Sequence, residues 1–168
     1  EELSRQFGYS ETLFLGQDFA IIKGENRKKV FSEIYQAKTK GKLVIYRASS
    51  EEMLRFVLEK TPADVVMGME TIHKSDSLHF VRGGLDQVLC KIAADRNKII
   101  GFSFSDIMES RNRERLMARM MANLALCKKY KVKTLFSGFF SNLKFMKSAH
   151  DLEAFWQVLE QGDRNIYR

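Results

Sequence analysis

Hydrophobic and polar positions along the 168-residue chain alternate between short apolar runs and longer stretches with helical spacing. Six short runs are apolar throughout, which is typical of strands covered on both faces. These runs are residues 11–16, 19–24, 42–48, 63–69, 98–104 and 132–139. Helices are predicted at about 27–37, after residue 50, from 82 or 83 to 94, at about 112–130 and at about 150–159. A strand followed by a helix, repeated along the chain, predicts parallel strands with helical crossovers in one α/β domain.

Two of the predicted helices carry a clear apolar stripe. In the helix that follows Gly84, the stripe consists of Leu85, Val88, Leu89 and Ile92. We expect it to pack against the strands at 63–69 and 99–104, because a crossover helix must cover its own sheet.

The long helix has apolar residues at three- and four-residue steps, with arginines beside them. The apolar set is Leu116, Met117, Met120, Met121 and Leu124, and the arginines are Arg111, Arg115 and Arg119. Methionine-rich faces suit either a core or a protein contact, and a core position is favoured here. Near the end of the chain, Phe155 and Trp156 are also predicted to be core residues.

The positive charge of the chain is concentrated in one segment. The net charge is +7, and residues 111–133 alone hold eight Lys or Arg and one acid, while the rest of the chain holds twenty of each. Such a segment favours a polyanionic partner, of which nucleic acid is the commonest. A solvated helix face with no partner is the alternative, and charge alone does not separate the two.

Candidate catalytic and metal-binding residues are few. His73 and Asp76 are close enough in sequence to share a cation, but they lack a third ligand, so no metal site is predicted. Three serines, Ser103, Ser105 and Ser137, lie where strands are predicted to end. No Gly-x-Ser-x-Gly motif or paired histidine accompanies them, so they are expected to cap the following helices, and no catalytic residue is predicted.

The remaining polar and small residues are given structural roles. Gly83-Gly84 is a weak match to a phosphate-binding turn because no further glycine follows at the required spacing. Asp86 is expected just inside the next helix, where a carboxylate favours the first turn. Cys90 and Cys127 lie at apolar helical positions without disulfide or zinc spacing, which indicates a reducing compartment. No run is long enough to span a membrane, so a cytoplasmic protein is predicted.

Two long segments carry a family resemblance. "HKSDSLHFVRGGLDQVLCKIAADRNKIIGFSFSDIM" and "NRERLMARMMANLALCKKYKVKTLFSG" resemble archaeal ribonuclease P protein component 3, the family of the eukaryotic thirty-kilodalton RNase P and MRP subunit. The shared marks are the Gly-aliphatic-Asp-x-Val-Leu helix start, the Gly-Phe-Ser strand, the arginine-rich helix with paired methionines, and the Lys-Tyr-Lys-Val turn. The resemblance extends from "GYSETLFL" to "DLEAFWQVL".

The resemblance implies a TIM-barrel-like fold whose opening strand is missing here. This agrees with a chain that begins in mid-pattern without methionine, so we expect one domain over residues 1–168 that is incomplete at its N-terminus. It also implies a non-catalytic subunit that binds the RNase P RNA and works with a small ferredoxin-like subunit. The RNA, using Mg²⁺, cleaves precursor tRNA, and the protein itself holds no cofactor.

The same resemblance implies which basic residues face the RNA. They are Arg55, Lys74, Arg96, Lys129 and Lys147, which we expect to be exposed and to form one continuous basic surface. The sequence departs from the family pattern at Ser137-Gly138-Phe139 and at Ala149, at the two ends of the loop at 137–148. Two other functions stay open, a metal-dependent phosphoesterase on a related barrel and a protein-interaction module that binds no RNA.

Overall fold

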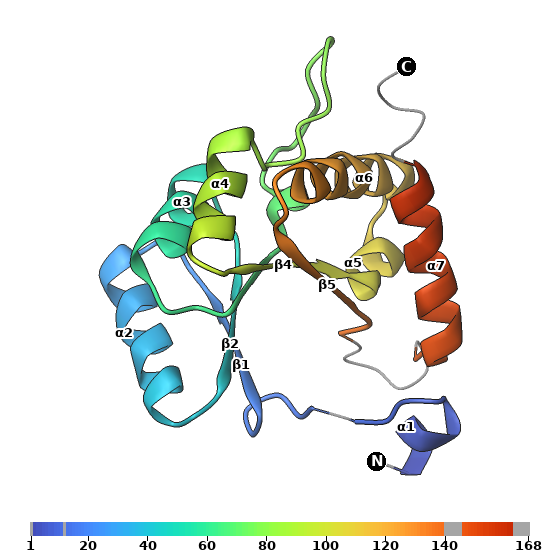
Figure 1. Cartoon of the computed structure of the whole chain (residues 1–168). Helices are drawn as coiled ribbons and strands as arrows, with labels where there is room; N and C mark the ends of the chain where they lie inside the picture. The colour runs from blue at the N-terminus through green and yellow to red at the C-terminus, as the bar shows by residue number, and fades with distance from the viewer. Residues whose placement is uncertain (1, 12, 140–145, 163–168) are drawn as a thin grey trace.

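The computed structural model of the chain describes residues 2–11, 13–139 and 146–162. Within these residues, five parallel strands form a sheet in the order β1-β2-β3-β4-β5 (Figure 1). They are β1 (Phe19–Lys23), β2 (Leu43–Arg47), β3 (Val65–Met67), β4 (Ile99–Ser103) and β5 (Lys133–Ser137). Each strand pairs with the next one along the chain, so each connection crosses back to the amino ends of the strands. The prediction of a parallel α/β fold is confirmed.

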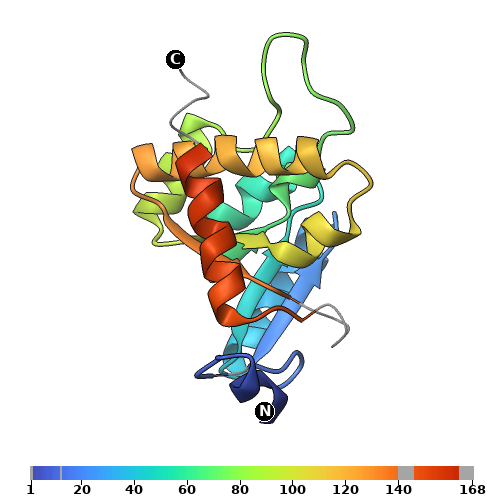
Figure 2. The same cartoon turned by 90° about the vertical axis from the view of Figure 1, so that its right-hand side faces the viewer.

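Helices fill the connections between the strands and flank the sheet. The described part of the chain holds α1 (Glu2–Gln6), α2 (Arg27–Thr39), α3 (Glu51–Lys60), α4 (Gln87–Asp95), α5 (Phe104–Glu109), α6 (Arg113–Lys129) and α7 (Ala149–Gly162), with a 3-10 turn η1 (Met69–Thr71) after β3. The sheet twists strongly, and helices α2, α3, α4, α6 and α7 cover one of its two faces (Figures 1 and 2). This arrangement is consistent with a barrel-like fold.

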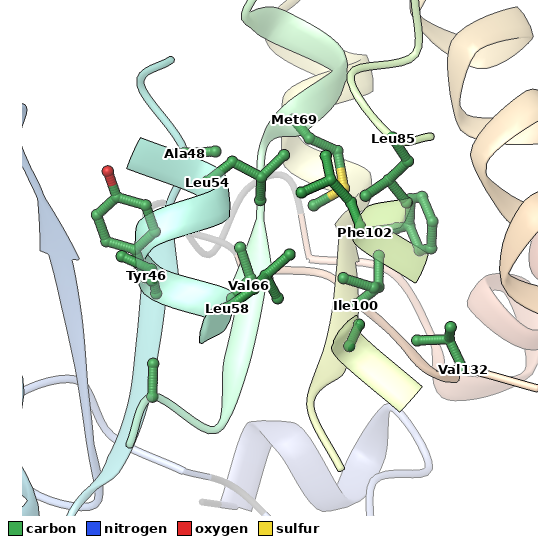
Figure 3. Close-up of a cluster of buried hydrophobic side chains, with 14 of the residues drawn as sticks. Tyr46, Ala48, Leu54, Leu58, Val66, Met69, Leu85, Ile100, Phe102 and Val132 are labelled. Carbon is green, nitrogen blue, oxygen red and sulfur yellow. The ribbon is translucent and has the colours of Figure 1, made fainter. Parts of the chain in front are cut away.

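The hydrophobic core lies between these helices and the sheet. Tyr46, Val66, Ile100 and Phe102 project from the strands toward buried helix residues such as Leu54 (Figure 3). A second, smaller buried cluster, Ile45, Val65 and Met67, occupies the opposite face of the sheet. Alternate residues of a strand thus enter two different clusters, which explains why the strand sequences are apolar throughout.

The first predicted strand, residues 11–16, is wrong. Among the described residues of this run, only Leu15 makes a bridge, an isolated parallel one with Phe19. The segment instead bends into a turn, because the Phe14 N–H donates to Asp18 Oδ2 at 2.8 Å and the Asp18 N–H donates to the Phe14 carbonyl at 2.9 Å. Leu13 and Leu15 are exposed. An apolar run becomes a strand only where a neighbouring strand can accept its hydrogen bonds.

Helix α4 begins later than predicted. Asp86 is its N-cap rather than an internal residue, and the Asp86 carboxylate accepts a 2.7 Å hydrogen bond from the Leu89 N–H. Leu85 and Leu89 are buried as predicted, and Ile92 is half-buried. Val88 is 46% exposed, so its predicted core position is wrong. With the helix starting at Gln87, Val88 lies in its first turn on the outer side.

The apolar stripe of α6 is confirmed as core. Leu116, Met120 and Leu124 are buried, while Met117 and Met121 are partly buried against the same cluster. Phe155 and Trp156 of α7 also pack against this cluster, as predicted. The sequence pattern did not predict the short helix α5 and instead placed Phe104 at the end of a strand.

Candidate functional site

All five basic residues predicted to contact RNA are exposed. Three of them lie on the helices that return to the amino ends of the strands. Arg96 is the C-cap of α4, directly before β4, and Lys129 is the last residue of α6, directly before β5. Arg55 lies midway along α3, the helix that leads into β3.

Arg55 and Arg96 share one carboxylate as a neighbour. Arg55 Nε donates to Glu59 Oε1 at 2.8 Å, one helical turn away. This hydrogen bond lowers the pKa of Glu59. Burial has a smaller, opposite effect, and the positive charge of Arg96 lowers the pKa further. Arg96 therefore lies near the end of α3, close to the Arg55–Glu59 pair.

A second pair of basic residues flanks Tyr130. The Nζ atoms of Lys129 and Lys91 lie 5.7 and 6.0 Å from the centroid of the Tyr130 ring. The Tyr130 hydroxyl donates to Gln87 Oε1 at 3.3 Å, which ties the end of α6 to α4. Since α4 packs against both α3 and α6, we name Arg55, Lys91, Arg96 and Lys129 the amino-edge cluster. Lys91 was not predicted, because only the packing of α4 on α6 brings it to Tyr130.

Lys74 and Lys147 lie at the other edge of the sheet. Lys74 follows η1 and the carboxyl end of β3, while Lys147 lies between the carboxyl end of β5 and the start of α7. The backbone carbonyl of Lys147 accepts a 2.7 Å hydrogen bond from the hydroxyl of Tyr9, beyond the end of α1. The five residues are therefore divided between the two edges of the sheet, because parallel strands have their amino ends at one edge and their carboxyl ends at the other. That they form one continuous basic surface stays a prediction. An RNA contact by any of the five residues stays a prediction.

Arg119 differs from the other arginines of α6. Its exposure is 2%, and it donates from Nη1 to the carbonyls of Glu70 and His73 at 2.7 Å each, and from Nε to Asp76 Oδ1 at 2.8 Å. Arg119 does lie beside the apolar stripe, one helical turn after Arg115, but its side chain is buried, which the sequence pattern did not indicate. The segment after β3 leaves backbone carbonyls inside the protein, and buried acceptors require a donor.

Asn123 and Glu70 complete this buried network. Asn123, one turn after Arg119, donates from Nδ2 to Glu70 Oε1 at 3.0 Å and to the Gly83 carbonyl at 2.7 Å. Glu70 is 1% exposed, and burial raises its pKa to about 7, although hydrogen bonds from its own backbone and from Asn123 oppose the rise. Neither residue was identified from the sequence, where Glu70 reads as an ordinary polar residue after a strand.

The residues considered for metal binding have other partners. His73 Nε2 lies 2.8 Å from Glu51 Oε1, and Asp76 is bound by Arg119. Across the described residues, no group of three or more His, Cys, Asp or Glu side chains is placed to hold a metal ion.

Hydroxyl groups at the carboxyl edge have structural contacts. Ser103 Oγ accepts from the Asp106 N–H at 3.3 Å and so caps α5, as predicted. Ser105 Oγ lies 2.9 Å from Ser103 Oγ, and Asp106 forms an ion pair with Arg47 at 2.9 Å. Ser137 ends β5, and residues 140–145 of the loop after it lie outside the described part of the chain.

No protein-family model matches the chain. Curated relatives do, and they are named ribonuclease P protein component 3. The one from a strain of Methanococcus maripaludis is 23% identical over 145 residues, 82% of this chain and 60% of the relative. The one from Methanosarcina barkeri is 30% identical over 127 residues, 71% of this chain and 50% of the relative. The chain thus spans between half and two thirds of the length of these relatives.

A solved structure shares the fold. A chain in the cryo-EM structure of archaeal ribonuclease P with mature tRNA matches with a TM-score of 0.73 and 23% identity, covering 83% of this chain and 58% of that one. A weaker match is a chain in the crystal structure of an uncharacterized protein, with a TM-score of 0.56 and 8% identity. The resemblance to archaeal ribonuclease P protein component 3 is confirmed. In the part of the chain that the structure describes, none of the helices is both long and apolar enough to cross a membrane.

Proposed function

We propose that this chain is a protein subunit of ribonuclease P that binds the catalytic RNA and supports 5′ maturation of precursor tRNA. The observation that carries the proposal is the agreement between sequence and fold, because the curated relatives are named ribonuclease P protein component 3 and the chain with the similar fold belongs to a structure of archaeal ribonuclease P. We also infer that the five described strands are part of a TIM-like barrel. Two buried, unpaired cysteines, Cys90 and Cys127, support a reducing compartment such as the cytoplasm.

The amino-edge cluster is the surface that we assign to the RNA. Its four side chains, Arg55, Lys91, Arg96 and Lys129, are exposed and come from three helices that pack side by side. Lys and Arg that neutralise backbone phosphates supply most of the affinity of nucleic-acid binding proteins, and they need no catalytic groups. The protein would therefore stabilise the folded RNA, which performs the cleavage with Mg²⁺.

A cleavage assay tests the proposal. Precursor tRNA is incubated with the RNase P RNA alone, with this chain, with a small ferredoxin-like subunit, and with both proteins, at high and at reduced magnesium. We expect little stimulation by this chain alone and strong stimulation by the pair at reduced magnesium, because protein cations replace part of the charge neutralisation. Cleavage by this chain without any RNA subunit would contradict the non-catalytic role and support a phosphoesterase instead. An absence of RNA binding would support a protein-interaction module.

A further inference from the structure

Residues 74–82 form an arm that extends from the body of the protein (Figures 1 and 2). The Ser77 N–H donates to the Phe80 carbonyl at 3.1 Å, which closes a turn at the tip. The tip is apolar and faces solvent, since Leu78 is 97%, Phe80 60% and Val81 40% exposed. Apolar residues in this position mark a contact with a partner more often than an ordinary loop.

The base of the arm is fixed by buried side chains. Arg119 binds the carbonyls of Glu70 and His73 ahead of the arm and the carboxylate of Asp76 inside it. The Asp76 carboxylate also accepts a 2.9 Å hydrogen bond from the Arg82 N–H, which joins the two limbs. Asn123 holds the Gly83 carbonyl where the chain returns. Both limbs are thus attached to one face of α6.

Gly83 and Gly84 are explained by this attachment. A Cβ on Gly83 would lie 2.2 Å from Asn123 Oδ1, and one on Gly84 would lie 2.4 Å from the Met69 carbonyl oxygen. Gly84 also has a φ of +86°, which other residues rarely adopt. The return limb therefore needs two glycines, and their role is to seat the arm rather than to bind a phosphate.

The charges on and beside the arm are positive. Lys74 and Arg82 are exposed, whereas the acid of the arm, Asp76, is already bound by Arg119. The Arg82 guanidinium carbon lies 5.9 Å from the centroid of the Phe80 ring.

The start of α6 adds further arginines on this side of the molecule. Burial raises the pKa of Asp76, but hydrogen bonds from the Arg82 N–H and Arg119 outweigh it and lower the pKa, with a smaller contribution from Arg115. Arg115 lies one helical turn before Arg119, the residue that binds the base of the arm. Arg113 and Arg115 occupy the first turn of α6, where the helix dipole disfavours positive charge.

We propose that the arm is a base-stacking contact for RNA, in which Phe80 stacks on an unpaired nucleotide while Arg82 and Lys74 bind the flanking phosphates. The inference rests on the proposed function and adds a second RNA contact, at the opposite edge of the sheet from the amino-edge cluster. Proteins commonly bind unpaired bases by stacking them on exposed aromatic rings beside arginine. A prearranged arm binds with a smaller loss of conformational entropy than a mobile loop would. The uncompensated positive charge favours RNA over a protein partner.

The test measures binding of the full chain to RNase P RNA over a range of salt concentrations. We expect Phe80→Ala to weaken binding roughly tenfold without changing the salt dependence, because stacking releases no counterions. Arg82→Ala should instead reduce the slope of log affinity against log salt by about 1. Phe80→Tyr should keep wild-type affinity. Tyr35→Ala removes an aromatic residue that is 45% exposed on α2 and is the matched control, with no expected change.

The outcomes separate this inference from the proposed function. If the wild-type chain shows no salt-dependent RNA binding, both are overturned. If the wild-type chain binds and Phe80→Ala binds equally well, the stacking contact is overturned and the proposed function stands. If Phe80→Ala keeps RNA affinity but no longer assembles with the small ferredoxin-like subunit, the arm is a protein contact and the inference is wrong. Circular dichroism of each variant must match wild type.

Discussion

The two edges of the sheet use basic side chains in different ways. At the amino edge, Lys129 is exposed, and the one contact of its charge in the described structure is the ring of the next residue, Tyr130. Near the carboxyl edge, Arg119 of the same helix is 2% exposed and binds two carbonyls and one carboxylate. One helix therefore carries a cation available to a partner and a cation that holds the protein itself.

This difference teaches that charge density alone does not identify a binding surface. Residues 111–133 contain the whole positive excess of the chain, yet their arginines do not share one role. A buried Arg must be paired because an unpaired charge in the interior is costly, whereas an exposed Lys has little effect on stability. Substitutions can therefore separate the structural cations from those that we assign to RNA contact.

The largest effect on stability is expected from a substitution in the hydrophobic core, which supports both edges of the sheet. Leu89→Asp should abolish folding, because a buried unpaired carboxylate costs several kcal/mol, comparable to the total stability of a domain. Val88→Asp is the matched control, since Val88 is 46% exposed and an aspartate there remains in water. Circular dichroism and urea denaturation measure both variants. Cooperative unfolding of Leu89→Asp near the wild-type midpoint would contradict the position assigned to α4.

The second-largest effect on stability is expected from replacing the buried arginine of α6, and a much smaller one from replacing an exposed arginine nearby. Arg119→Ala should lower the free energy of unfolding by about 3 kcal/mol, because it leaves buried carbonyls and the Asp76 carboxylate without a donor. Arg111→Ala, which changes an exposed arginine just before α6, should alter it by less than about 0.5 kcal/mol. Urea denaturation at neutral pH measures both. If both substitutions changed the free energy of unfolding equally, the structural role assigned to Arg119 would be wrong.

The third prediction concerns the pH dependence of the buried network. Glu70 keeps its proton up to a pKa of about 7 in the folded protein, against 4.5 for an unperturbed glutamate. The folded state therefore binds one more proton than the unfolded chain between these pH values, so stability falls as pH rises through this window. At 1.36 kcal/mol per pKa unit, the loss reaches up to roughly 3 kcal/mol.

Glu70→Gln provides the control for this prediction, because the amide keeps an oxygen for Asn123 but does not titrate in this range. Thermal unfolding from pH 5 to pH 8 should show a steeper decrease for wild type than for Glu70→Gln. Parallel curves would show that Glu70 does not carry the pH dependence.

Local pattern was enough to predict most of the fold. Apolar runs identified all five described strands, and the capping role of Ser103 followed from its position at a predicted strand end. The failures came where a residue depends on distant neighbours. The run at 11–16 has strand composition but no neighbouring strand to pair with, and its chain turns at Asp18 instead.

The candidate sites were only partly predictable for the same reason. The exposure of Arg55, Arg96 and Lys129 was expected from the family resemblance, and the structure has all three side chains exposed. The burial of Arg119 did not, because it depends on carbonyls about fifty positions earlier in the chain. The separation of Lys74 from the amino-edge cluster follows from strand direction, which a comparison of motifs does not include.

The smallest effect on stability, and the one that tests the amino-edge cluster, is expected from its exposed cations. Arg96→Ala and Lys129→Ala should leave the unfolding midpoint unchanged within error, because exposed charges contribute little to stability. Each should weaken binding to RNase P RNA modestly and lower the slope of log affinity against log salt by about 1, as expected for the loss of one phosphate contact. Lys28→Ala, an exposed lysine in the first turn of α2, should change neither quantity. If the salt slope stays at its wild-type value in Arg96→Ala and Lys129→Ala, the RNA contact lies elsewhere on the protein. The exposed lysines and arginines at the carboxyl edge would then be the next to change.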